Sequence, residues 1–526
     1  MSILGNKNIE CDYSLWKKVD RALYYKYNCI PWQKLNNTVF FILSKINREV
    51  LTWLKSSYKS EYLLFIVDHD KIIYFLNSYF GNIEFASNYL YYKNSSSSAK
   101  DIKYSSLIYI SFLLFVSICT LIKKYSYFAL MVVFIILCAN SLFKLTCTIL
   151  GFYQRYESKK NKEKLNDEDL PMYTILLPVF KEREVIEQLI SNINAIDYPK
   201  SKLDIKLILE DDDIELVNFF AEYTLPEHFD IIKVPNSFPQ TKAKACNYAM
   251  FFAKGEYVVV YDADDKPEHL QLKKALVKFR EGNNKLACVQ AKLSYYNSDV
   301  NFLTRSFHLE YMNWFHYLLP GFEKANIPIP LGGSSVHFSV EIFKKVFLFD
   351  AYNVTEDADL GLRFAQMGYR TAIIDSETME ESPIKPLAWI KQRARWIKGY
   401  IQTYIVHLKN IKQLYINCGL KGILLLNIFI GSTAFIFFLT PFLLVSITYI
   451  QLLNKLFLYY FVVTYCANLV VLFLIIKQRK LSTSFYITSL FFPVYRILHS
   501  IASFRALVEL ITCPQHWNKT KHGYRK

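Results

Sequence analysis

The chain has 526 residues, with 62 Lys and Arg against 46 Asp and Glu, which gives a formal net charge of +16. Hydrophobic residues make up 52% and charged residues 21%, which excludes a disordered or fibrous chain. A basic balance is typical of nucleic-acid-binding proteins, but a positive mean hydropathy of +0.13 is unusual for a soluble one. The distribution of the apolar residues therefore decides the class of protein.

Apolar and charged residues are segregated along the chain. Four apolar runs each come close to the ~20 residues that span a bilayer core. They cover residues 105–122, 127–150, 423–450 and 456–476, and Lys144 interrupts the second. A buried core helix explains one such run more easily than four, so we predict an integral, multi-pass membrane protein.

Basic residues beside these runs predict the orientation. The stretches 155–164 and 477–480 are rich in Lys and Arg, and such stretches face the cytoplasm. The polar middle, 153–420, is then cytoplasmic, at what we expect to be a bacterial inner (plasma) membrane. Lys123 and Lys124 then lie outside, against the trend.

The last segment, 481–526, is apolar at first but contains Pro493, Arg496, His499 and Glu509, and it ends in a basic tail. We interpret it as an interfacial or re-entrant element, with a fifth span as the alternative. The predicted order is thus an N-terminal domain, two transmembrane helices, a cytoplasmic domain, two more transmembrane helices and the last segment. The boundaries are 1–98, 105–150, 153–420, 421–480 and 481–526.

Short apolar runs alternate with helical patterns in the polar middle, as in an α/β domain. Tyr173–Leu177 is a predicted strand ended by Pro178, and Ile205–Leu209 and Tyr257–Tyr261 are two more. Near-continuous Val, Ile and Leu runs indicate a parallel sheet covered on both faces. In such sheets, ligands bind beyond the carboxyl ends of the strands.

Acidic residues follow two of these strands: Glu210 to Asp213 come after the second, and Asp262-Ala263-Asp264-Asp265 after the third. Clustered carboxylates at one sheet edge repel each other unless a cation lies between them. Hard oxygen ligands suit Mg²⁺ or Mn²⁺, shared with phosphate oxygens. Solvated acidic turns are the alternative for either cluster taken alone.

Two further segments have a structural and a functional interpretation. Lys242 and Lys244 are either helix-surface charges or the cations that hold a diphosphate. Gly332-Gly333 is either a plain turn or backbone that approaches a ligand closely.

Thr355-Glu356-Asp357 precedes a helical pattern that ends near Gly368. In one account, Thr355 caps the helix and the acids favour its positive end. In the other, one of the carboxylates is a general base.

The helical stretch from Trp389 to Tyr400 combines Arg, Lys and Trp. It is either an interfacial helix or a site where Arg clamps phosphate oxygens and Trp stacks on a sugar. The residues alone leave both interpretations open.

These motifs, in this order, resemble the membrane-embedded family 2 glycosyltransferases of the cellulose-synthase-like group. The acidic strand end, Asp262-Ala263-Asp264, Thr355-Glu356-Asp357 and Gln392-Arg393-Ala394-Arg395-Trp396 stand where that group has its D, DxD, TED and QxxRW motifs. The resemblance covers about residues 172–526. It implies a GT-A fold between transmembrane helices, a nucleotide-diphosphate sugar donor, and inversion at the anomeric carbon.

The resemblance also implies roles for individual residues. Asp357 is the expected base, with Glu356 beside it, and Asp262 and Asp264 are the expected ligands of Mg²⁺ or Mn²⁺. The donor-binding residues are then Asp211 or Asp212, Lys242, Lys244, Asp262, Gln392, Arg393, Arg395 and Trp396. The first motif reads Glu-Asp-Asp-Asp, and a glycine-rich segment expected before the TED motif reads Val346-Phe347-Leu348-Phe349-Asp350. The second departure leaves the acid and removes the glycines.

The first 98 residues faintly resemble the N-terminal domain of type II secretion ATPases. We expect a small, degenerate α+β packing or docking domain, joined to the first span by the Asn- and Ser-rich linker 94–98.

The predicted function is processive sugar transfer, most consistent with a UDP-sugar donor and a growing glycan, at the cytoplasmic face of the bilayer. One transfer to a lipid carrier, giving a glycolipid, is the first alternative, and an inactive membrane scaffold or receptor is the second. Nucleic acid is not an expected partner, because the cations flank spans and diphosphate motifs and do not form one stripe. Regulatory or export subunits cannot be read from these motifs.

Overall fold

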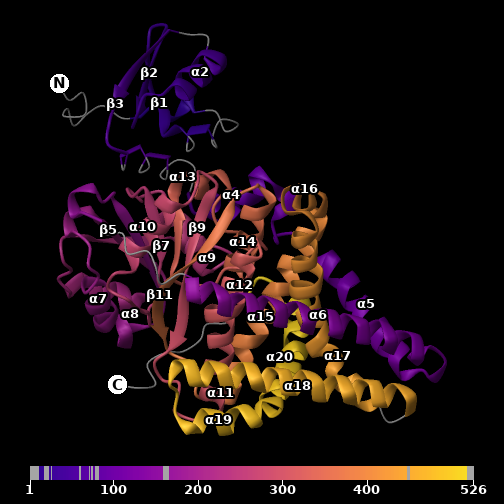
Figure 1. Ribbon diagram of the computed structural model, residues 1–526. Helices are drawn as coiled ribbons and strands as arrows, with labels where there is room; N and C mark the ends of the chain where they lie inside the picture. The colour runs from indigo at the N-terminus through magenta and orange to yellow at the C-terminus, as the bar shows by residue number, and fades with distance from the viewer. Residues whose placement is uncertain are drawn as a thin grey trace.

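The computed structural model describes residues 11–16, 23–24, 27–58, 61–69, 71–72, 75–76, 82–157, 165–446 and 451–517. An α/β body lies beside a group of long apolar helices, and a small N-terminal sheet sits apart from the main sheet (Figure 1). Most of the basic stretch 155–164 and the tail after Trp517 lie outside the described residues.

An eight-stranded sheet, ordered β6-β5-β4-β7-β10-β9-β11-β8, forms the centre of the α/β body. Its strands are β4 (Tyr173–Val179), β5 (Leu203–Glu210), β6 (Phe229–Val234), β7 (Tyr257–Val260), β8 (Lys266–Pro267), β9 (Leu286–Tyr295), β10 (Val336–Ser339) and β11 (Arg370–Glu380). β6, β5, β4 and β7 pair in parallel. β10 pairs antiparallel with β7 and β9, and β8 pairs antiparallel with β11.

The α/β class is confirmed, and the three predicted strands, β4, β5 and β7, pair in parallel, as do β9 and β11; the expectation was wrong for β10 and β8, which run against the other strands. The apolar runs indicate only that both faces of the sheet are buried, and this burial is the same for parallel and antiparallel strands. Direction depends on the path of the connections. The expected end of the first strand at Pro178 also shifts, because β4 continues to Val179. Beyond Leu176, β4 pairs with β5 but no longer with β7, and proline is tolerated at such an edge.

Helices cover both faces of the sheet. Ile175 and Leu177 of β4 pack in one apolar cluster with α7 (Ile186–Asn194) and α8 (Ile214–Glu222). Leu176 points to the other face and packs in the cluster that includes α9 (Lys242–Ala249). The body also contains α10 (Gln271–Glu281), α11 (Phe302–Asn313), the π-helix η9 (Trp314–Leu318), α12 (Leu319–Lys324), α13 (Val340–Lys345), α14 (Glu356–Gln366) and α15 (Pro386–Lys409).

Three helices are long and apolar enough to cross a membrane, by length and composition alone and among the described residues. They run over Tyr127–Gln154, Ile411–Leu443 and Lys455–Arg479, and they overlap the second, third and fourth predicted runs. The first predicted run forms a shorter apolar helix, Ser105–Leu121, and the last apolar stretch forms two helices bent by 60°. That bend suits either a broken span or a re-entrant element.

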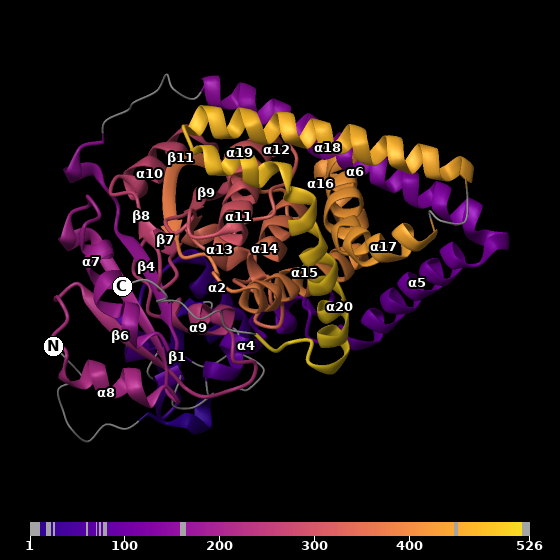
Figure 2. The ribbon, with the colours of Figure 1, turned by 90° about the horizontal axis from the view of Figure 1, so that it is seen from below.

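These apolar helices form one group beside the body. They are α5 (Lys103–Leu121), α6 (Lys123–Glu157), α16 (Ile411–Leu424), the π-helix η10 (Leu425–Gly431), α17 (Ser432–Ser446), α18 (Gln451–Arg479), α19 (Thr483–Leu490) and α20 (Phe492–Thr512). α6 and α18 lie side by side along one edge of the group (Figure 2). α20 packs against α15 and α17, so the last apolar stretch lies between the other helices and the body.

Two glycines let α6 approach the body at backbone distance. A Cβ atom at Gly151 would lie 1.7 Å from the carbonyl oxygen of Tyr317, and one at Gly321 would lie 1.7 Å from that of Cys147. No other residue type fits at either position without moving the backbone. The apolar helix is thus fixed against η9 and α12.

Gly321→Ala is expected to destabilise the protein by about 1–3 kcal/mol, because the added methyl group must displace the α6 backbone. Thermal unfolding of the detergent-solubilised chain measures this loss. Lys324→Ala, at an exposed position of the same helix, is the control. An unchanged midpoint for Gly321→Ala would contradict the close contact.

The N-terminal domain has β1 (Cys29–Leu35), β2 (Thr38–Leu43) and β3 (Glu61–Ile66) in one sheet, with α2 (Arg48–Ser57) and α4 (Asn82–Lys93). It packs against the segment that contains α9: the Asn247 side chain donates a hydrogen bond to the carbonyl of Ala86 at 3.0 Å. A ring nitrogen of His69 lies 2.7 Å from the carbonyl oxygen of Phe251. Its likeness to the secretion ATPase domain stays a prediction.

Candidate active site

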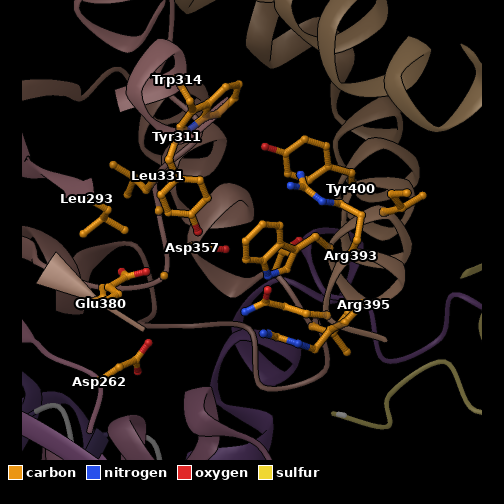
Figure 3. A pocket seen from close by; sticks show the side chains of 18 of the residues that line it. Asp262, Leu293, Tyr311, Trp314, Leu331, Asp357, Glu380, Arg393, Arg395 and Tyr400 are labelled. Carbon is orange, nitrogen blue, oxygen red and sulfur yellow. The ribbon is translucent and has the colours of Figure 1, made fainter. Parts of the chain in front are cut away.

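A single cavity of about 350 Å³ joins the carboxyl ends of the strands to the apolar helices. Its lining includes Asp262 and Asp264 after β7, Asp357 on α14, and Arg395 and Trp396 on α15. Figure 3 shows Asp262 and Glu380 at one end, Tyr311 and Trp314 at the other, and Asp357 between them. Motifs that are far apart in the chain therefore meet in one place.

The acidic end of the cavity is built by the turn after β7. Asp262 forms an ion pair with Lys242, and its backbone N–H donates to Asp265 at 2.8 Å. Asp264 accepts a hydrogen bond from the backbone N–H of Glu381 at 2.8 Å. Asp265 is fully buried, accepts from the Ser334 hydroxyl, and has one carboxylate oxygen without a hydrogen-bond partner.

Glu380 and Glu381 complete this acidic end, and the motif analysis missed both. Glu380 ends β11 and Glu381 follows it, and the pairing of β11 with β9 and β8 brings this end beside the turn after β7. The usable signal was a pair of acidic residues at the end of a strand. It was missed because β11 has polar residues at alternate positions and does not form a continuous apolar run. Only the sheet order places Glu380 near Asp262.

Burial raises the pKa values of Asp265 and Glu380 well above their usual range, and the neighbouring carboxylates raise them further. Among the described residues, no group of three or more His, Cys, Asp or Glu is arranged as a ready-made metal site. The donor set nevertheless fits a hard divalent cation that takes its other ligands from phosphate. Asp262 and Asp264, which line the cavity, would hold such an ion, and its charge would relieve the repulsion among the carboxylates at this end.

The two candidate lysines occupy different environments. The Lys242 ammonium lines the cavity and bonds to the Asp262 carboxylate and to the Gly333 carbonyl at 2.5 Å. Burial would lower the pKa of Lys242, but Asp262 and then Glu356 hold it above its usual value. Lys244 is fully buried, pairs with Glu210 at 2.9 Å, and does not line the cavity.

The first acidic motif stands beside the cavity with only one of its acids in the wall. Glu210, the buried partner of Lys244, lines the cavity, whereas Asp211 and Asp212 are exposed outside it. Gln240 bonds to both carboxylate oxygens of Asp212, at 3.0 and 2.9 Å, and itself lines the cavity.

Asp357 points one carboxylate oxygen into the cavity. Oδ1 accepts a hydrogen bond from the Ala358 N–H at 2.7 Å, while Oδ2 lies 3.3 Å from the place where a Cβ at Gly333 would be. The absence of a side chain at Gly333 therefore keeps the space beside Oδ2 open. Burial raises the pKa of Asp357 to about 6. Burial, and then the charge of Asp357, raises the pKa of the buried Glu356 to about 7.

The capping role expected for Thr355 is only partly correct. Thr355 stands at the N-cap position of α14, but its side chain makes no capping hydrogen bond. The hydroxyl lies 3.4 Å from Asn353 instead. Gly399 of α15 lies directly beside this side chain, since a Cβ there would lie 2.3 Å from the Thr355 hydroxyl. The close approach of α15 seats this turn and brings the two motifs together.

Arg393 is held by an acid that the motif analysis did not single out. Its guanidinium makes a two-pronged ion pair with Glu310 of α11, at 3.1 and 2.7 Å. Burial would raise the pKa of Glu310, but Arg393 holds it well below its usual range. Arg393 lines the cavity, yet its charge is already neutralised and it is not free to clamp a phosphate.

Arg395 is the available cation of this motif. Its guanidinium lies 5.3 Å from the Trp517 ring, and its Nε atom is buried without a hydrogen-bond partner. Burial lowers the pKa of Arg395, while Glu356 and Asp357 act to raise it. The Oε1 atom of Gln392 also lines the cavity without a hydrogen-bond partner. Within the described part of the chain, both groups therefore have a free hydrogen-bonding position in the cavity wall.

Aromatic rings form the wall beyond Asp357. The rings of Trp396 and Tyr311 are stacked, with centroids 6.0 Å apart and an interplanar angle of 25°. Trp314 stacks on Phe429 at 5.3 Å. Flat apolar faces of this kind suit the apolar face of a sugar ring.

The segment before the TED motif turns away from the cavity. Phe347 and Leu348 have φ angles of 70° and 60°, in the left-handed region that favours the glycines this chain lacks. The retained acid, Asp350, accepts hydrogen bonds from the Ala99 N–H at 2.6 Å and the Ser98 hydroxyl at 3.0 Å. It therefore anchors the linker and does not line the cavity.

Known proteins match the part of the chain that carries most of these motifs. Residues 257–476 match the family model described as Glycosyl transferase family group 2. The chain is 27% identical, over 273 residues, to a Bacillus subtilis (strain 168) protein called Probable glycosyltransferase YdaM. That alignment covers 50% of this chain and 62% of the relative, so the chain spans about three fifths of the relative's length.

Two solved structures show weaker likenesses. The mannosyltransferase PcManGT from Pyrobaculum calidifontis, in complex with GDP-Man and Mn²⁺, has a TM-score of 0.47 and 17% identity, over 73% of this chain and 99% of that chain. S. aureus TarS has a TM-score of 0.29 and 14% identity, over 51% of this chain and 48% of that chain. Both scores are under 0.5, so neither carries an argument here. The family match and the mixed α/β sheet agree with a GT-A-like fold, and residues 257–476 are similar to glycosyltransferase family group 2.

Proposed function

We propose that this protein transfers a sugar, with inversion at the anomeric carbon, from a nucleotide-diphosphate sugar to a growing glycan. One observation carries the proposal: a single cavity in which the acidic turn after β7 and the free cation Arg395 flank the carboxylate of Asp357. The family 2 segment supports the same reaction class.

The acidic end is suited to the donor. Asp262 and Asp264 would hold Mg²⁺ or Mn²⁺, which, when bound, offsets the negative charge that develops on the departing diphosphate. At this end of the cavity, Arg395 and the Asp262-paired Lys242 can contact phosphate oxygens, and Gln392 offers an unpartnered amide oxygen to a donor group. Asp212 and Gln240 stand beside this end, where the nucleotide would extend. Lys244 acts indirectly, by neutralising Glu210.

Asp357 is the proposed general base. Its Oδ2 atom takes the proton of the acceptor hydroxyl while the hydroxyl oxygen attacks C1 of the donor and the bond from C1 to the diphosphate breaks. The Ala358 N–H holds the other carboxylate oxygen and so fixes the orientation of the group. Glu356 is the neighbouring acid: the charge of Asp357 raises its pKa, and that of Lys242 lowers it.

The aromatic wall supports a glycan acceptor. Trp396 and Tyr311 offer a platform for the sugar that receives the next unit, and the cavity continues toward the apolar helices. A second candidate, one transfer to a lipid carrier, is favoured by two cations, Lys144 and Arg496, at that far end. Product size separates the two candidates, since processive transfer gives a polymer and single transfer gives one glycolipid.

The proposed location is the cytoplasmic face of a membrane that the apolar helices cross. The end of α6 packs on η9 and α12, and Arg479 at the end of α18 pairs with Glu377 of β11. The C-terminal ends of both helices therefore adjoin the α/β body, and Arg479 lies at that end of α18, as the positive-inside rule favours for a cytoplasmic domain.

Release of nucleotide from a panel of UDP- and GDP-sugars, with and without Mn²⁺ or Mg²⁺, tests the proposed function. We expect the purified full-length chain to release nucleotide from at least one donor in a metal-dependent manner. If a folded protein releases no nucleotide from any donor, the result would favour the alternative of an inactive membrane scaffold.

A further inference from the structure

The far end of the cavity carries charge that the proposed chemistry does not use. There the lining includes Lys144 of α6, Phe429 of η10, Asn468 of α18 and Arg496 of α20. Within the described part of the chain, neither Lys144 nor Arg496 forms an ion pair; Lys144 lies 5.2 Å from the Phe429 ring, and Arg496 lies 5.7 Å from that of Phe492. Uncompensated cations among apolar helices are costly unless an anion is bound.

The neighbouring acid does not provide that anion. Glu310 also lines the cavity, but its carboxylate already accepts two hydrogen bonds from Arg393 and one from the Tyr495 hydroxyl at 2.5 Å. Two positive charges and one neutralised pair therefore remain at this end of the cavity. A neutral glycan offers nothing to balance them.

The cations stand on the far side of the aromatic wall from the acidic end. Trp314 lies opposite Asp262 in the cavity (Figure 3), Trp314 stacks on Phe429, and Lys144 lies over the same ring. A ligand that reaches from Lys144 to Asp357 thus passes the aromatic rings of Trp314 and Tyr311. That space suits a sugar placed between a charged group and the reaction centre.

The depth and exposure of this end favour a lipid. Lys144 is one helical turn from Cys147, the residue at the α6–α12 contact, so it lies where α6 leaves the α/β body. Arg496 and Asn468 line the cavity and are also exposed, and the same two helices carry exposed apolar side chains, Val470 on α18 and Val494 on α20. The helices that would hold an anion here therefore also present apolar side chains on which a lipid tail can lie.

We propose that Lys144 and Arg496 bind the phosphate of a lipid-linked acceptor, whose sugar lies against the aromatic wall. The proposal rests on the proposed function, because it names the acceptor of that site. A hydroxyl of the lipid-linked sugar attacks C1 of the donor, its proton goes to Asp357, and the nucleotide diphosphate leaves. The phosphate only holds the acceptor in the cavity; it neither forms nor breaks a bond in the transfer.

Binding measurements on the full-length chain in lipid nanodiscs test this site without using turnover. The probes are a polyprenyl phosphate, the matching polyprenol, and inorganic phosphate, followed by native mass spectrometry or Trp fluorescence. We expect the wild type to bind the polyprenyl phosphate at least about tenfold more tightly than the polyprenol, since charge-assisted hydrogen bonds contribute that much. Lys144→Met and Arg496→Gln should each remove most of this preference.

Two control variants show whether the loss of preference depends on positive charge at this site. Lys144→Arg keeps the charge and should retain the preference, whereas Arg505→Gln, on the same helix but outside the cavity, should leave it intact. Equal wild-type binding of polyprenol and polyprenyl phosphate overturns the proposal, and so does an equal loss in Arg505→Gln. Inorganic phosphate that displaces the lipid at similar concentration also overturns it, because the site would then bind free phosphate.

The two proposals fail in different ways. If the phosphate lipid binds as expected but no donor releases nucleotide, the proposed function fails and the lipid site stands. If metal-dependent nucleotide release occurs and the phosphate gives no preference, the lipid site fails and the sugar transfer stands.

Discussion

Asp357→Asn is expected to lower the rate of sugar transfer by about a hundredfold or more, because the acceptor hydroxyl loses its general base. Asparagine has nearly the same shape and its side-chain oxygen can still accept the Ala358 N–H, so the turn should keep its conformation. Turnover with the donor found in the panel, measured together with thermal unfolding, separates a lost base from a lost fold.

The pH profile supplies the second readout. A base acts when deprotonated, and burial raises the pKa of Asp357 to about 6 and that of Glu356 to about 7. The activity of the wild type should therefore fall as the pH is lowered through 7 to 6. The residual activity of Asp357→Asn should fall less over this range, because Asp357 no longer titrates. The control is Asp299→Asn, an exposed acid outside the cavity. Full activity in Asp357→Asn would show that Asp357 is not the general base.

Asp264→Asn is expected to reduce metal-dependent turnover by about a hundredfold to a thousandfold, because the departing diphosphate loses much of its charge stabilisation. The backbone contact from Glu381 can still be accepted by the asparagine oxygen, so the local turn should persist. Titration of activity with Mn²⁺ should show a weaker apparent affinity as well as a lower maximum.

Metal affinity should also depend on pH in a stated direction. Burial and neighbouring carboxylates raise the pKa of Glu380, which lines the cavity with Asp262 and Asp264, so protonation at this end competes with the cation and Mn²⁺ binding should weaken as the pH falls. Asp197→Asn, an acid outside the cavity, is the control for Asp264→Asn. An unchanged Mn²⁺ titration in Asp264→Asn would remove this residue from the metal site.

Some of the site could be read from the sequence because local rules govern it. An acidic turn directly after a buried strand must lie at the carboxyl edge of the sheet, and this places Asp262 and Asp264 in the cavity. Asp357 opens a helix, and Arg395 and Trp396 are next to each other on another. Each of these positions follows from a few neighbouring residues.

Other parts depend on pairs that no local pattern reports. Arg393 looked like a phosphate clamp, yet Glu310, 83 positions away, neutralises it. Lys244 looked equivalent to Lys242, but helix geometry turns it toward Glu210 while Lys242 faces Asp262. The reversed direction of β10 and the arrival of Glu380 beside Asp262 follow from the order of the strands.

The sequence by itself determined that apolar helices flank an α/β domain and which carboxylates stand at its strand ends, because hydrophobic runs and strand-end residues are local properties. The tertiary structure decided which charges are already paired and which still face the cavity. A buried charge is free or neutralised according to what lies within a few ångströms of it, and those neighbours come from distant parts of the chain. That is why the +16 charge leaves Lys144, Arg395 and Arg496 available to ligands, a distinction that composition cannot make.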